Sequence, residues 1–141
     1  MSLETKVCVT ALCVFFLSAL FTGVWKYGWV MRGPTHRAPT YVDIAHHAAM
    51  HYSFATLILV YLVQLSDLGT TINLIAAGTM LLFFATAIAT YIGLGVANQT
   101  DNQFRERNFG TTVGMYALIA GEVGGFLILT VGALRHIWFS A

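Results

Sequence analysis

The apolar positions of this chain form four long runs that are separated by short polar segments. The runs cover residues 7–24, 45–65, 72–97 and 110–134. A helix that crosses a hydrocarbon core needs roughly 20 apolar residues. None of the runs shows the alternation of a lipid-facing strand. Because backbone groups in lipid must bond to one another, the pattern predicts four membrane-spanning helices.

The polar segments carry turn and capping signals. Thr40 and Asp43 have the spacing of a capping box, which predicts that the second helix starts near residue 41. Residues 66–69 predict a tight turn, with Thr70 or Thr71 capping the third helix. We therefore expect an all-α integral membrane protein, an antiparallel bundle of four transmembrane helices in a single domain over residues 1–141. The expected helices cover residues 7–24, 41–65, 71–97 and 109–136.

Composition excludes several classes of protein. Apolar residues make up 57% of the chain and charged residues only 9%, whereas soluble domains carry about 25% charged residues. The aromatic and aliphatic content excludes intrinsic disorder. A net charge of +1 argues against nucleic-acid binding, which needs a basic patch. The expected surroundings are therefore the lipid bilayer and other membrane subunits.

The basic residues predict an orientation. Five of the seven Lys and Arg side chains lie in the expected loops 25–40 and 98–108, and the other two, Lys6 and Arg135, lie toward the opposite side. The basic side of a membrane protein is usually cytoplasmic. We expect these two loops to be cytoplasmic and both termini to lie on the opposite side of a multi-pass protein.

Glycines form a stripe along the fourth expected helix. They are spaced four, seven, four and seven residues apart, at Gly110, Gly114, Gly121, Gly125 and Gly132. Small residues on one arc let two helix backbones approach closely in lipid. The stripe predicts close helix packing, either within the chain or with another subunit.

Histidines gather at the start of the second helix. Asp43, His47 and His51 share one face at i, i+4 and i+8, and His46 lies beside them. Histidines at this spacing can bind a metal, and a single histidine can ligate haem. With Met115 as a further candidate ligand, the cluster suggests a binding site for haem b, for copper or iron, or for a quinone. The alternative is interfacial histidines that bind nothing.

Glu122 lies near the middle of the fourth helix. An ionisable group at that depth is costly and marks a functional hypothesis. It suggests a proton relay, a cation site or a hydrogen-bonded structural acid. Neutral side chains that could pair with it are Gln64, Tyr61, Thr86 and Tyr91.

The segment 101–108 is the most highly charged part of the chain. Arg105 and Arg107 suggest a head-group or docking site, or a solvated turn whose arginines reach the interface. The chain length, the four spans and the longer first loop resemble the family of membrane-associated proteins in eicosanoid and glutathione metabolism (MAPEG). Arg105-Glu106-Arg107 before a glycine-containing helix is similar to that family, but its helix-2 signature of Arg, Asn and Glu is absent from residues 43–51.

These features lead to three functional hypotheses. The first is a small integral subunit of a membrane oxidoreductase or energy-converting complex, which packs through the fourth helix and helps bind a metal, haem or quinone near His47 and His51. The second, implied by the resemblance, is a homo-oligomeric MAPEG-like enzyme with a lipophilic substrate. The third is a small proton- or cation-conducting protein that uses Glu122. The sequence leaves open whether the chain is an enzyme.

Overall fold

The computed structural model describes residues 1–139, in which helices are the only regular secondary structure and no strand occurs. Four of its helical segments are long and apolar enough to cross a membrane. This confirms the all-α class and the four long apolar helices. The elements are α1 (Leu3–Arg32), α2 (Thr40–Leu65), α3 (Thr70–Ala97), a π-helical turn η1 (Gly110–Gly114) and α4 (Met115–Phe139).

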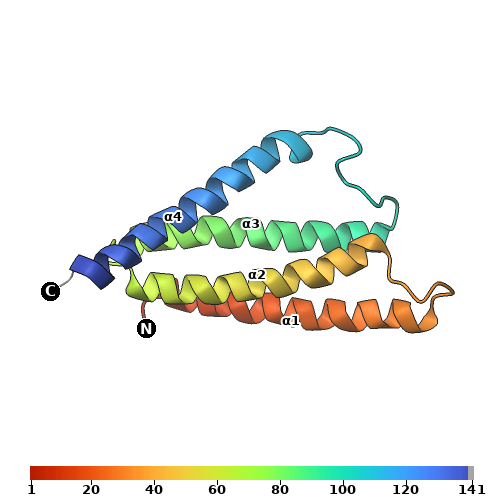
Figure 1. The fold of residues 1–141 in the computed structure, drawn as a ribbon, viewed down its shortest axis with the longest axis horizontal. Coiled ribbons are helices and arrows are strands. Elements are labelled where there is room, and N and C mark those ends of the chain that lie inside the picture. The colour runs from red at the N-terminus through yellow and green to blue at the C-terminus, as the bar shows by residue number, and fades with distance from the viewer. Residues whose placement is uncertain (140–141) are drawn as a thin grey trace.

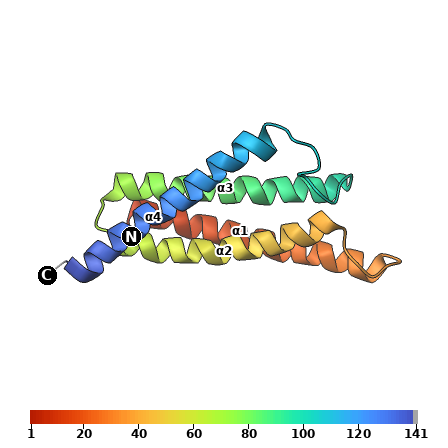
Figure 2. The same ribbon diagram turned by 45° about the horizontal axis from the view of Figure 1, so that its top comes forward.

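The helices divide into three that lie side by side and one that crosses them. Figures 1 and 2 show α1, α2 and α3 along the long axis of the molecule, with α4 oblique to them. The C-terminal part of α4 lies against the other helices, while its N-terminal part diverges from α3 (Figure 1). Both α2 and α3 contact α4, and the most extensive helix contact joins α1 to α2. The result is a closed end near the turn 66–69 and an open end near the segment 98–109.

The core is built from both large and small side chains. Leu59 and Leu129 are completely or almost completely buried, and so are the small residues Ala45, Ala49 and Ala77. Buried alanines let the helices approach closely, as glycines do. The outward faces are also apolar, and Phe21, Val96 and Tyr116 are each more than 70% exposed.

Gly95 is the point where three helices meet most closely. A Cβ atom at Gly95 would lie 2.8 Å from Trp25 Cη2 of α1 and 3.2 Å from the backbone of Tyr41 in α2. Only glycine leaves room for this approach of α3 to both neighbours. The meeting point lies near the open end of the molecule, at the last turns of α3.

The first helix is longer than the run 7–24 predicted. It begins at Leu3 and continues to Arg32, so Trp25 to Trp29 belong to the helix and the connecting segment is 33–39 rather than 25–40. The apolar run ends at Val24, but the first proline of the chain is Pro34, so no proline ends the helix before Gly33. The membrane-length pattern therefore identified the helix but not its end.

The capping predictions for α2 and α3 were wrong. Thr40 is the first residue of α2 after Pro39, and neither residue makes a side-chain capping hydrogen bond. The carboxylate of Asp43 instead forms an ion pair with Lys26 of α1 at 2.5 Å. The residue before α3 is Gly69, whose φ of 84° suits glycine because it has no Cβ.

Candidate functional site

His46, one of the predicted ligands, contributes to helix packing. Its Nδ1 lies 3.0 Å from the carbonyl oxygen of Ala19 in α1. Its ring also covers Gly23, where an added Cβ would lie 3.0 Å from His46 Cε1. The hydrogen bond and the close contact fix the ring between α1 and α2, so this face of the imidazole already has a structural role.

His47 and His51 lie on the outward side of α2, where both are exposed. Their rings are stacked with centroids 6.5 Å apart. His47 Nδ1 also lies 2.9 Å from the carbonyl oxygen of Asp43 and 3.5 Å from its carboxylate. The ring of His51 makes no hydrogen bond within residues 1–139, so it has the most available nitrogens of the three.

The described residues do not complete a metal centre. Residues 1–139 contain no group of three or more His, Cys, Asp or Glu side chains placed to hold a metal ion. Met115, the predicted partner from the fourth helix, lines a cleft against α3 instead. A metal ion at His47 or His51 would therefore need ligands beyond the His, Cys, Asp and Glu side chains of residues 1–139.

Glu122 is half-buried, and its Oε1 atom is inaccessible to solvent. That oxygen has no hydrogen-bond partner within residues 1–139. None of the four neutral side chains expected to pair with it forms that bond, and Thr86 donates to the carbonyl oxygen of Phe83 instead. A buried polar atom without a partner costs free energy, so Glu122 still requires an explanation.

The glycine stripe divides into two halves. A Cβ at Gly125 would lie 2.8 Å from the carbonyl oxygen of Ala76 and 2.8 Å from Met80 Cγ. Gly121 similarly packs on Phe83, and Gly132 packs on the turn at Ser66 and Leu68. By contrast, the nearest atoms to a Cβ at Gly110 or Gly114 belong to the segment just before them in the chain. The C-terminal half is thus used within the chain, and the N-terminal half contacts none of the helices α1, α2 and α3 among the described residues.

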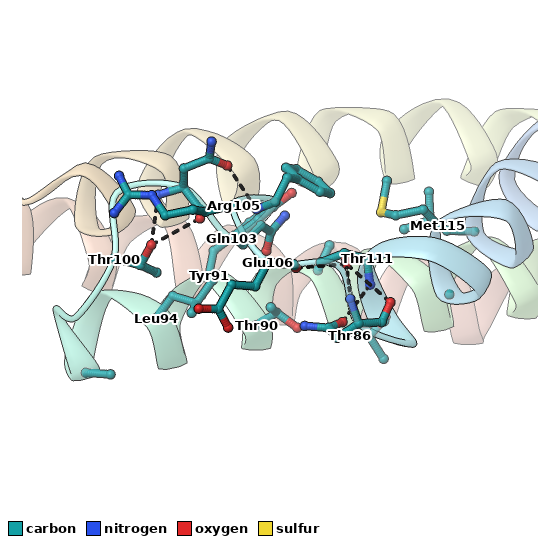
Figure 3. A pocket seen from close by; sticks show the side chains of 18 of the residues that line it. Thr86, Thr90, Tyr91, Leu94, Thr100, Gln103, Arg105, Glu106, Thr111 and Met115 are labelled. Atoms are coloured by element: carbon teal, nitrogen blue, oxygen red, sulfur yellow. Dashed lines mark hydrogen bonds between the residues drawn. The ribbon is translucent and has the colours of Figure 1, made fainter.

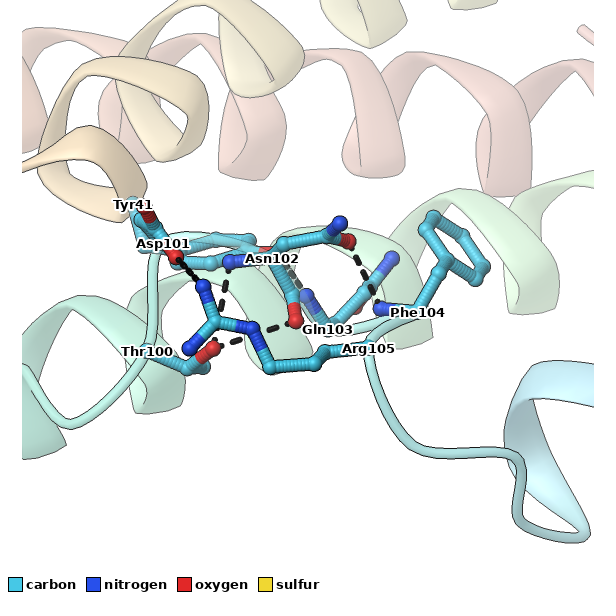
Figure 4. Close-up of polar contacts among 7 residues, drawn as sticks. All are labelled: Tyr41, Thr100, Asp101, Asn102, Gln103, Phe104 and Arg105. Carbon is cyan, nitrogen blue, oxygen red and sulfur yellow. Dashed lines mark hydrogen bonds and ion pairs between the residues drawn. The ribbon is translucent and has the colours of Figure 1, made fainter.

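The segment 98–109 folds onto itself and onto α2. Arg105 forms an ion pair with Asp101 at 3.0 Å, and the backbone N–H of Gln103 donates a 2.6 Å hydrogen bond to the hydroxyl of Tyr41 (Figure 4). The segment ends in a reciprocal pair, since Asn108 and Thr111 each accept the other's backbone N–H at 2.9 Å. Of the two predicted head-group arginines, Arg105 is already paired with a carboxylate.

A cleft of about 730 Å³ opens where α4 diverges from α3. We call it the α3–α4 cleft. Phe83, Tyr91 and Leu94 belong to its α3 wall, and Met115 and Leu118 belong to α4. Figure 3 shows the polar residues at its loop end together with the side chains of α3. The polar members of the lining are Thr86, Thr90, Tyr91, Gln99, Thr100, Asn102, Gln103, Arg105, Glu106, Asn108 and Thr111.

Sequence reasoning missed this cleft. The available signal was a pair of hydroxyl residues, Thr86 and Thr90, one turn apart on one face of an otherwise apolar run. A second signal, the π-helical turn at Gly110–Gly114, is a geometry common at functional sites, but it is visible only in the structure. Neither signal reveals that α4 diverges from α3.

No protein-family model matches the sequence, and no curated protein or solved structure is significantly similar to it. The functional argument therefore depends on the geometry of the described residues.

Proposed function

We propose that the chain spans a membrane as an antiparallel four-helix bundle and is a small integral subunit of a multi-subunit membrane oxidoreductase or energy-converting complex. The membrane part is supported by the outward surface, where large apolar side chains such as Phe21 and Val96 are exposed over the helices. Soluble monomers rarely expose apolar surface on this scale. The basic side of a membrane protein is usually cytoplasmic, so we place the segments 33–39 and 98–109 on the cytoplasmic side.

The subunit role is supported above all by one stripe on the outward face of α2. Its members recur at alternating spacings of four and three residues and are all exposed. This is the repeat by which helices pack side by side in a seam. We call it the α2 stripe, and it consists of His47, His51, Phe54, Ile58, Tyr61 and Leu65.

The two exposed imidazoles at one end of the α2 stripe keep nitrogens that no residue within 1–139 binds. A polar ring that faces hydrocarbon is costly, and His51 makes no hydrogen bond within residues 1–139. A helix of another subunit along the stripe would cover the rings and could add a ligand. In that arrangement His47 or His51 would supply one nitrogen to a haem or metal ion, and the other subunit would supply the rest.

The test is site-specific cross-linking in the native membrane. A photo-reactive residue at Ile58, within the α2 stripe, should cross-link to a polypeptide of different sequence, and the same residue at Leu82 of α3 should not. The complex purified through the cross-link at Ile58 should also show an optical absorbance. His51→Leu should remove this absorbance, and Tyr61→Phe should leave it intact. Cross-links only to copies of this chain, or none at Ile58, would contradict the subunit role.

The MAPEG-like alternative has weaker support. An enzyme of that kind would bind a polar co-substrate at Arg105 and Arg107, but Arg105 is already paired with Asp101 at 3.0 Å. A homo-oligomer formed only by this chain, with a thiol cofactor bound, would favour that alternative over the subunit role.

The orphaned oxygen of Glu122 favours a second candidate function, proton or cation conduction. A carboxyl group inside the helices whose Oε1 lacks a partner among residues 1–139 can exchange a proton or hold a cation. Glu122→Gln keeps the shape and removes the titratable group. In proteoliposomes this change should abolish ion flux, while Glu106→Gln in the exposed loop should not. Equal flux in both variants would exclude the role of Glu122.

A further inference from the structure

The α3–α4 cleft has an apolar interior and a polar end. Phe83, Leu94 and Leu118 are among its apolar lining residues, and its polar end is formed by the segment 98–109. Its volume of about 730 Å³ is within the usual range of small-molecule sites. If the four helices span a membrane, this cleft opens sideways to lipid and its polar end lies at the interface.

Two hydroxyl groups on the α3 wall have no hydrogen-bond partner within residues 1–139. A threonine in a helix commonly bonds back to a carbonyl of the preceding turn, and Thr79 and Thr86 of α3 both do so at 2.9 Å. Thr90 makes no such bond, and the hydroxyl of Tyr91 makes none either within the described chain; its ring stacks on Tyr41 instead. The wall therefore offers two adjacent donors to a molecule in the cleft.

The charges at the polar end do not favour an anion. Arg105 and Glu106 both line the cleft, and their formal charges cancel. Arg105 is also neutralised by Asp101 at 3.0 Å. A phosphate or carboxylate head would meet no unpaired cation among the described lining residues, whereas an uncharged head would meet only hydrogen-bonding groups.

We propose that the α3–α4 cleft binds a neutral amphiphile. Its uncharged polar ring or head accepts hydrogen bonds from Thr90 and Tyr91, and its apolar chain passes between α3 and α4 into the bilayer. Lipid-soluble quinones and related ring compounds have this chemistry. The inference rests on the membrane insertion proposed above but not on the subunit role.

Two glycines of the same helical segment provide a matched test of the site. Gly114 lines the cleft, and a Cβ there would lie 3.6 Å from the nearest atom, the carbonyl oxygen of Phe109. Gly124 is outside the cleft, and a Cβ there meets nothing within 4 Å. Gly114→Leu should fill the cleft and Gly124→Leu should not, although both add the same side chain.

The probe is a short-chain alkyl benzoquinone that carries a photo-reactive group, added to the purified full chain in nanodiscs. Wild type and Gly124→Leu should be labelled within residues 83–118, and Gly114→Leu should lose roughly tenfold in affinity. Thr90→Val and Tyr91→Phe should each lose roughly fivefold. Thr10→Val and Tyr27→Phe, which remove hydroxyls away from the cleft, should bind as wild type does.

Competition separates the kinds of ligand. Unlabelled benzoquinone should displace the probe, and an alkyl phosphate or a plain alkane of the same chain length should not. Equal displacement by all three, or equal labelling of the Gly114 and Gly124 variants, would overturn the proposal. This measurement uses the chain alone, so its failure is distinct from a failure of the cross-linking at Ile58.

Discussion

The two halves of the fourth helical segment share a glycine pattern but have different surroundings. In the C-terminal half, Gly121, Gly125 and Gly132 lie against α3 and the turn that precedes it. In the N-terminal half, Gly110 and Gly114 meet only their own preceding segment, and the α3–α4 cleft opens beside them. The comparison shows that spacing alone identifies where close packing is sterically allowed. Whether it occurs depends on the helix opposite.

The residues opposite the two halves explain part of the difference. The C-terminal half, which we call the closed half, faces Ala76 and Met80 of α3. Gly125 lies against the backbone of Ala76 there, and the flexible side chain of Met80 fills the remaining space. The open half faces Thr86, Thr90 and Tyr91, which are polar members of the cleft lining. The hydroxyls of Thr90 and Tyr91 have no hydrogen-bond partner within residues 1–139, so they do not contribute to dry packing and favour an opening that a ligand can occupy.

The largest expected effect concerns the closed half. Gly125→Leu would place a Cβ 2.8 Å from the carbonyl oxygen of Ala76, and this backbone atom cannot move aside easily. We expect a loss of about 3 kcal/mol in the free energy of unfolding, measured by denaturant titration in detergent. Gly114→Leu and Gly124→Leu should lose less than about 1 kcal/mol. Similar losses in all three would show that the two halves pack alike.

A second experiment measures access to the cleft. In a background without Cys8 and Cys13, Thr90→Cys should react readily with a water-soluble maleimide because residue 90 lines the polar end of the cleft. Thr79→Cys should be protected, since Thr79 Cγ2 lies 3.0 Å from the position of a Cβ on Gly121 in the closed half. Protection of both thiols in nanodiscs would mean that water does not enter the cleft.

The smallest expected effect concerns the contact that holds the loop at the open end. Tyr41→Phe removes the hydroxyl that accepts the backbone N–H of Gln103 at 2.6 Å. We expect a loss of about 1 kcal/mol and faster hydrogen exchange in residues 99–104. The control Tyr27→Phe alters an exposed side chain of α1 and should leave exchange unchanged. Unchanged exchange in Tyr41→Phe would indicate that other contacts hold the loop.

The sequence predicted the helices well because the four apolar runs are long and lack the alternation of strands. It predicted helix ends poorly, since Lys26 lies inside α1 and pairs with Asp43 of the next helix. That pair also explains why Asp43 is not a cap. The local spacing of residues in the sequence does not reveal side-chain partners that lie on different helices.

The candidate site was less predictable than the fold. Helical periodicity correctly placed His47 and His51 on one side of α2, but the packing of His46 on Ala19 depends on the neighbouring helix. The cleft depends on the divergence of α4, which is a tertiary property. Thr90 and Tyr91 become notable only when their hydroxyls are seen to lack partners within the described residues.

The close approach at Gly95 has a consequence for how a ligand enters and leaves at the open end. Trp25, Tyr41 and Gly95 already join α1, α2 and α3 there without any contribution from α4. The first turns of the last helix can therefore shift outward while the three-helix framework keeps its shape. A molecule could enter or leave beside that helix without loosening the rest of the protein.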